Sequence, residues 1–78
     1  MRYEPVRNVV VSMVESELRT LAAGSGVSHA AVAKIRYSQT HDPRISTVEK
    51  LSRFLFDSED GRDLVAHVEH RLRARILT

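Results

Sequence analysis

The side chains best suited to bind a ligand lie close together in the stretch SHAAVAKIRY, at positions 28–37. A histidine, a lysine, an arginine and a tyrosine alternate there with serine and alanine. Imidazole, ammonium, guanidinium and phenol groups all donate hydrogen bonds, and small neighbours permit a close approach. This set suits contact with a nucleic acid, whose phosphates and base edges accept such bonds.

The distribution of charge supports the same interpretation. The net charge is only +2, but residues 24–56 hold five cations and two acids. Residues 1–23 are balanced, and residues 57–78 hold four arginines and five acids. Positive charge is therefore concentrated around positions 28–37, as expected of a small surface that binds a polyanion.

Other classes of function have less support. The sequence has no apolar run of 18 residues, so no membrane span is expected. It has no cysteine, which excludes disulfides and thiolate metal sites and fits a reducing cytoplasm. His67 and His70 could share a helix face, but no third ligand accompanies them. No spacing marks a nucleophile and its base, so we expect neither a metal, nor another cofactor, nor an enzyme.

The segments before and after residues 28–37 are all predicted to be helices, because apolar residues recur in them every three or four positions. The triplet Val9-Val10-Val11 could also form a strand, but no second such run exists to pair with it. A polar loop at 38–43 and a polar break at 57–61 separate the later helices. The expected helices cover about residues 5–13, 17–25, 29–37, 47–56 and 60–77.

Single residues mark the ends of these helices. Ser16 and Ser28 stand where they can cap the second and third. Ser46 and Glu49 have the spacing of a capping box for the fourth. Gly26 can adopt the left-handed conformation that ends the second helix without Cβ strain.

The two segments on either side of Gly26 meet the packing demands of a helix-turn-helix. Ala22 is small where the helices would cross, and Val27 follows the glycine as a core plug. Further apolar residues would face each other across the pair, namely Leu21, Val32 and Ile35. An ordinary helical hairpin would satisfy part of this pattern as well.

On these residues the chain resembles the helix-turn-helix family of phage repressors, Cro proteins and their bacterial relatives. The resemblance spans about residues 5–56 and includes DPRISTVEKL at 42–51, which is similar to the family's loop and fourth helix. It implies a compact, all-α, five-helix lambda-repressor-like domain, with a DNA-binding core at 1–56 and a longer C-terminal helix at 57–78. Two residues depart from the pattern. Leu18 stands where the family often has a phosphate-binding glutamine, and Gly24 costs its helix about 1 kcal/mol relative to alanine.

The resemblance implies that the helix at 28–37 enters the major groove of double-stranded DNA. The chain would then be a sequence-specific transcriptional regulator in the cytoplasm, and we expect it to act as a repressor. Tyr37 could instead lie at the edge of the core, and RNA binding is less favoured because aromatic residues are only 5%. The base contacts expected are Ser28, His29, Ala30, Ala33 and Lys34, and the phosphate contacts expected are Arg36, Tyr37, Gln39 and Arg44.

The last helix is longer than so small a body needs. It carries an apolar stripe that includes Leu64, Val68, Leu72 and Ile76. We expect two copies to pair through this stripe, so that a homodimer reads a palindromic operator. Two alternatives stay open: the helix folds back on its own chain, or it binds a protein partner, as antitoxins of related fold do.

Overall fold

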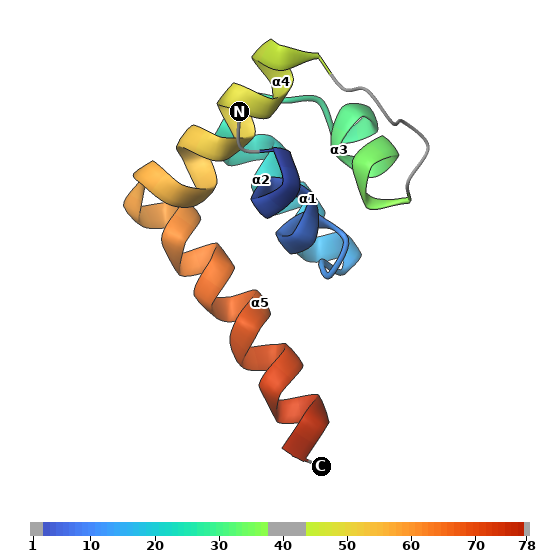
Figure 1. The fold of residues 1–78 in the computed structure, drawn as a ribbon, viewed down its shortest axis with the longest axis vertical. Coiled ribbons are helices and arrows are strands. Elements are labelled where there is room, and N and C mark those ends of the chain that lie inside the picture. The colour runs from blue at the N-terminus through green and yellow to red at the C-terminus, as the bar shows by residue number, and fades with distance from the viewer. Residues whose placement is uncertain (1–2, 38–43, 78) are drawn as a thin grey trace.

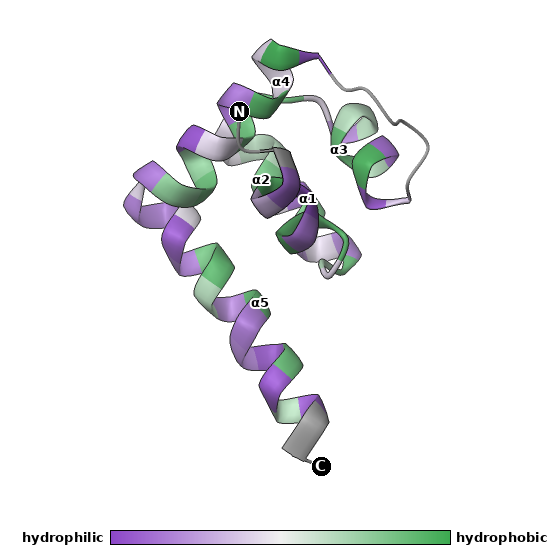
Figure 2. Cartoon of the chain, viewed as in Figure 1, coloured by the Kyte–Doolittle hydropathy of each residue, from purple (hydrophilic) through white to green (hydrophobic). Residues whose placement is uncertain are grey.

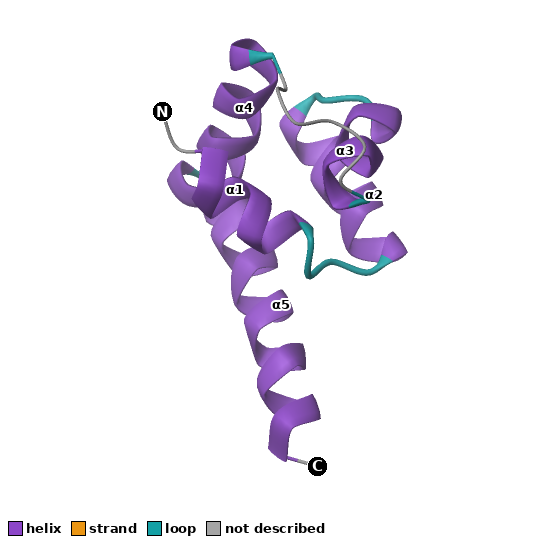
Figure 3. Ribbon diagram, turned by 45° about the vertical axis from the view of Figure 1, so that its right-hand side comes forward, coloured by secondary structure: helices purple, strands orange, loops and turns teal. Residues whose placement is uncertain are grey.

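The computed structural model describes residues 3–37 and 44–77, and within them it forms five α-helices and no strand (Figures 1 and 3). The predicted all-α class with five helices is therefore confirmed. A π-helical turn, η1, connects α4 directly to the segment before α5. The elements in order are α1 (Tyr3–Val10), α2 (Glu15–Ser25), α3 (His29–Arg36), α4 (Ile45–Ser52), η1 (Arg53–Asp57) and α5 (Glu59–Leu77).

The turn between α2 and α3 forms as predicted. Gly26 has φ 77° and its N–H donates to the Ala22 carbonyl at 3.1 Å, which closes the end of α2. Ser28 is extended, and its Oγ accepts a hydrogen bond from the N–H of Ala31 at 3.2 Å. Only three residues, 26–28, therefore lie between the two helices.

Two other predicted caps are wrong. Helix α2 begins at Glu15 rather than after Ser16, because the Glu17 carboxylate accepts from the Val14 N–H at 2.9 Å. Helix α4 begins at Ile45, so Ser46 lies inside its first turn and does not cap it. In both places the helix starts two residues earlier than the serine suggested.

The predicted polar break at 57–61 is reduced to one residue, Ser58. Its Oγ donates to the Phe54 carbonyl at 2.6 Å and accepts from the Gly61 N–H at 3.0 Å. Ser58 thus ends η1 and caps α5, in the position of an N-cap serine.

All five helices contribute to one core. Its members are Val6, Val10, Met13, Leu18, Leu21, Val27, Val32, Ile35, Leu51, Leu55, Leu64 and Val68. Because Leu64 and Val68 belong to α5, the core continues across position 56, where the sequence suggested a division. The second half of α5 runs on past the other helices (Figure 1), and Figure 2 shows that it is mostly hydrophilic.

Two glycines allow Phe54 to pack closely against both α2 and α5. A Cβ at Gly24 would collide with the Phe54 ring, so this glycine makes room for that side chain. A Cβ at Gly61 would overlap the Phe54 carbonyl, which is backbone and cannot swing away. Gly61 is therefore a requirement of the η1–α5 junction.

We expect Gly61→Ala to lower the free energy of unfolding by about 2 kcal/mol or more, because the new methyl group must push α5 away from η1. Helix propensity alone predicts the opposite sign, a gain of about 1 kcal/mol. Urea denaturation followed by circular dichroism measures the difference. A variant as stable as the parent, or more stable, would contradict the close approach.

Candidate nucleic-acid interface

Helix α3 has one face in the core and one face in solvent. Val32 and Ile35 are buried, with exposed fractions of 0% and 1%. The exposed residues recur at helical spacing on the other side, where His29, Ala30, Lys34 and Tyr37 lie, with Ala33 half-buried among them. No acidic residue occurs in α3, so this face carries only neutral and basic side chains.

The beginning of α3 is joined to the beginning of α2 by a contact between an imidazole and a carboxylate that no local sequence pattern predicted. His29 Nε2 lies 2.8 Å from Glu15 Oε1, and both side chains are about half exposed. Arg19 Nε lies 3.7 Å from the same oxygen. His29, which we predicted to be open to a base edge, thus has a partner on α2. The neighbouring Ser28 Oγ is also engaged, as the acceptor of the cap hydrogen bond.

The end of α3 is anchored by Arg36. Its Nε donates to the Met13 carbonyl at 2.7 Å, and its guanidinium carbon lies 5.2 Å from the centre of the Tyr37 ring. The predicted phosphate contact Arg36 therefore ties α3 to the segment between α1 and α2. Tyr37 is 56% exposed, so the alternative that placed it at the edge of the core is wrong.

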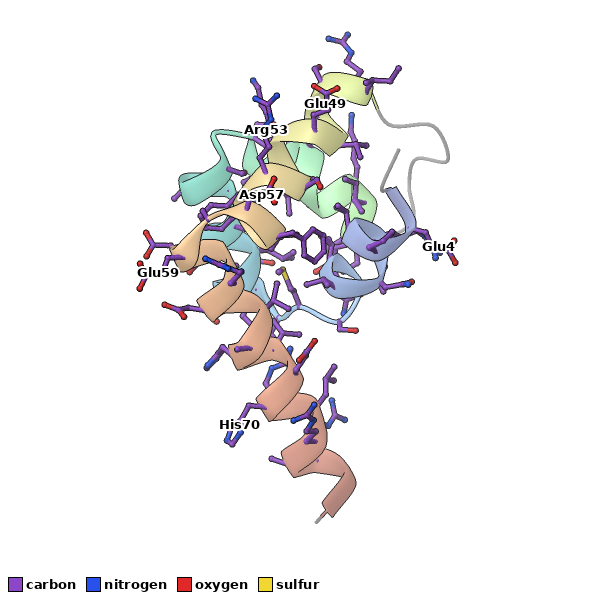
Figure 4. All side chains as sticks on the ribbon, turned by 60° about the vertical axis from the view of Figure 1, so that its left-hand side comes forward. Glu4, Glu49, Arg53, Asp57, Glu59 and His70 are labelled. Atoms are coloured by element: carbon purple, nitrogen blue, oxygen red, sulfur yellow. The ribbon has the colours of Figure 1, made fainter. Side chains whose placement is uncertain are left out.

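Further basic residues lie before α4, within it and directly after it. Arg44 precedes α4 and is exposed, as are Lys50 and Arg53. Lys50 and Arg53 border an open hollow of about 290 Å³ at the end of α2, which Ser25 also lines. Figure 4 shows Arg53 pointing away from the body of the protein. Gln39, the remaining predicted phosphate contact, lies outside the described residues.

The predicted dimer interface needs correction. Leu64 and Val68 are 8% and 2% exposed in the single chain, so they fill its own core and offer no apolar area to a second copy. This is the alternative in which the last helix folds back on its own monomer. Leu72 is half-buried at the edge of that core, and the side chain of Ile76 lies outside the described residues.

What remains of the apolar stripe borders α1. An open hollow of about 200 Å³ separates the two helices, and Val9 and Leu72 are half-buried beside it. The hollow is lined by Asn8, Val9, Ser12, Val65, Val68, Glu69 and Leu72.

The two histidines of α5 do not come together with further ligands. His67 Nε2 lies 3.5 Å from Glu17 Oε2, whereas His70 projects from the outer half of the helix in Figure 4. Among the residues that the structure describes, no group of three or more histidine, aspartate or glutamate side chains could hold a metal ion. The helices of these same residues include none whose length and apolarity would suffice to cross a bilayer.

A buried ion pair connects α2 to α5. Glu17 is 3% exposed and receives two hydrogen bonds from Arg71, from Nη2 to Oε1 at 2.7 Å and from Nε to Oε2 at 3.2 Å. Arg71 Nη2 also donates to the Ser12 carbonyl at 2.6 Å. Burial raises the pKa of Glu17, but hydrogen bonds from Arg71 and Val14 and the charges of Arg71 and His67 outweigh it, so the pKa is lowered.

Comparison with models of protein families, with curated proteins and with solved structures found no match for this chain.

Proposed function

We propose that this chain binds double-stranded DNA in a sequence-specific way, through residues 28–37. By this binding it regulates transcription in the cytoplasm as a repressor. One observation carries the proposal: α3 is held to the core by Val32 and Ile35 while its opposite face is exposed and free of acids. A major groove about 12 Å wide admits such a helix. The three-residue turn after α2 leaves most of that face exposed, with Glu15 of α2 in contact with His29 at its start.

The side chains of this face match what the groove offers. Ala30 and Ala33 are small enough for a close approach and can contact thymine methyl groups. Lys34 can donate to guanine O6 and N7 or to a phosphate. Tyr37 and Arg44, both exposed, can donate to phosphates and fix the register of the protein on the duplex.

Selection of bound fragments from a random duplex pool tests the proposal. We expect enrichment of one defined sequence, and an affinity that falls steeply with salt because bound phosphates release counterions. Equal affinity for every duplex, at all salt concentrations, would contradict sequence-specific binding.

We expect Lys34→Ala to weaken binding to the selected duplex by about tenfold, which is 1.4 kcal/mol. Lys34 is exposed, so the free energy of unfolding should hardly change. Fluorescence anisotropy on a labelled duplex measures the affinity. Arg62→Ala, which removes an exposed cation from α5, is the matched control. Equal losses in both variants would show that Lys34 acts only through net charge.

A homodimer is the form in which so short a recognition helix gains enough contacts, because two copies can read two halves of a palindrome. The edge formed by Val9, Val65 and Leu72 beside the α1–α5 hollow offers an apolar surface for this pairing. Light scattering should then give twice the 8.8 kDa of one chain. A second candidate function is an antitoxin-like module that uses the projecting α5 to bind a protein partner. A chain that is monomeric and enriches no sequence from the duplex pool would favour this second candidate.

A further inference from the structure

A close contact between the Glu15 carboxylate and the His29 imidazole joins the starts of α2 and α3 at the surface proposed to meet DNA. The side chains are 47% and 45% exposed, so the pair contributes little to the core. It lies at the first residue of α3, the end of the helix that would approach base edges. The Glu15 carboxylate therefore affects the hydrogen bonds that this imidazole can make with a base.

The carboxylate determines which ring nitrogen carries the hydrogen. An ionised carboxylate can only accept hydrogen bonds, so the nitrogen 2.8 Å from Glu15 Oε1, His29 Nε2, must be the donor. In a neutral imidazole the other nitrogen, Nδ1, then has a lone pair and can only accept. Arg19, at 3.7 Å from the same carboxylate oxygen, offsets part of the negative charge that Glu15 brings toward the phosphates.

This inference rests on the proposed function: we propose that Glu15 is a positioning residue, which determines the bases that His29 can hydrogen-bond. The pair presents an acceptor to the major groove, where adenine N6 and cytosine N4 carry amino donors. Guanine presents O6 and N7, and thymine presents O4, all of which are acceptors and cannot bond to Nδ1. His29 therefore selects a base with an exposed amino group.

Parallel binding-site selections test this inference, with the parent chain, Glu15→Gln and His29→Ala. For the parent we expect one position of each half-site to prefer adenine or cytosine by about tenfold or more. His29→Ala should abolish that preference and leave the other positions unchanged. In Glu15→Gln the amide can donate to Nε2, which allows the other tautomer, so guanine and thymine should be accepted within about threefold.

Glu59→Gln removes an equal charge at the start of α5, which Figure 4 shows well away from α3, and it should leave every preference unchanged. The inference is overturned if the position that responds to His29→Ala prefers guanine or thymine in the parent, or if Glu15→Gln keeps the parent's preference. If the parent enriches no sequence, the proposed function itself has failed.

Discussion

Glu17→Gln is expected to lower the free energy of unfolding by about 3 kcal/mol. The substitution preserves size but leaves the guanidinium of Arg71 in a partly buried site without its counter-charge. Removing one partner of a buried ion pair typically costs about 3–5 kcal/mol. A small domain has a total stability of roughly 5–15 kcal/mol, so this is a large share of it. Urea denaturation at neutral pH measures the change.

The same substitution should change how stability depends on pH. The pKa of Glu17 in the folded chain lies below its ordinary value of 4.5. The ion pair therefore stabilises the fold fully above that ordinary value, and its contribution is lost as pH falls through the lowered pKa. The difference in stability between the parent and Glu17→Gln should accordingly shrink as the pH is lowered below 4.5.

Glu69→Gln serves as the control for both measurements, because Glu69 is an exposed acid on the same helix as Arg71. Its stability should stay within about 0.5 kcal/mol of the parent. An unfolding midpoint for Glu17→Gln equal to that of the control would contradict the role assigned to the buried pair.

Ala30→Glu should abolish detectable sequence-specific DNA binding, with at least a hundredfold loss of affinity, about 3 kcal/mol. Ala30 is exposed in the first turn of α3, so a glutamate there fits the helix dipole and leaves the fold intact. The same carboxylate would face the phosphates and take the space that a close approach requires. Anisotropy with the selected duplex, together with a thermal melt, measures both effects.

The matched control is Ala66→Glu, which adds the same charge at an exposed position of α5. It should reduce affinity only slightly, through net charge. If the two variants bind equally well, α3 does not make the contact.

Local signals in the sequence predicted the α2–α3 turn correctly. Gly26 and Ser28 act through backbone conformation and through a hydrogen bond three residues away, and both effects are visible in a short window. The spacing of apolar residues likewise placed Val32 and Ile35 in the core. The exposure of Lys34 and Tyr37 followed from the same periodicity.

Contacts between distant residues could not be predicted in this way. Arg36 bonds to the carbonyl of Met13, 23 positions earlier, and Arg71 bonds to Glu17, 54 positions earlier. Glu17, and not Ser16, provides the side chain that accepts a hydrogen bond at the start of α2, and its carboxylate is buried. Gly24 lowers the helix propensity of α2, but the Phe54 ring occupies the space that a side chain would need there.

The apolar stripe on α5 shows a second limit of prediction from sequence. Helical periodicity identifies an apolar face, but it does not say whether the same chain or another covers it. Leu64 and Val68 are covered by their own core, whereas Val65 and Leu72 lie at its edge. Only the packing of α5 against the rest of the chain distinguishes the two pairs.

Amide chemical-shift mapping tests the central claim most directly. The uniformly ¹⁵N-labelled chain is titrated with a mixed-sequence duplex at low salt, where non-specific contacts already occupy the binding surface. We expect the largest shifts at residues 28–37, with Arg44 and the residues around it affected less. Shifts confined to α5, or no shifts at all, would contradict the assignment of α3 as the DNA-binding helix.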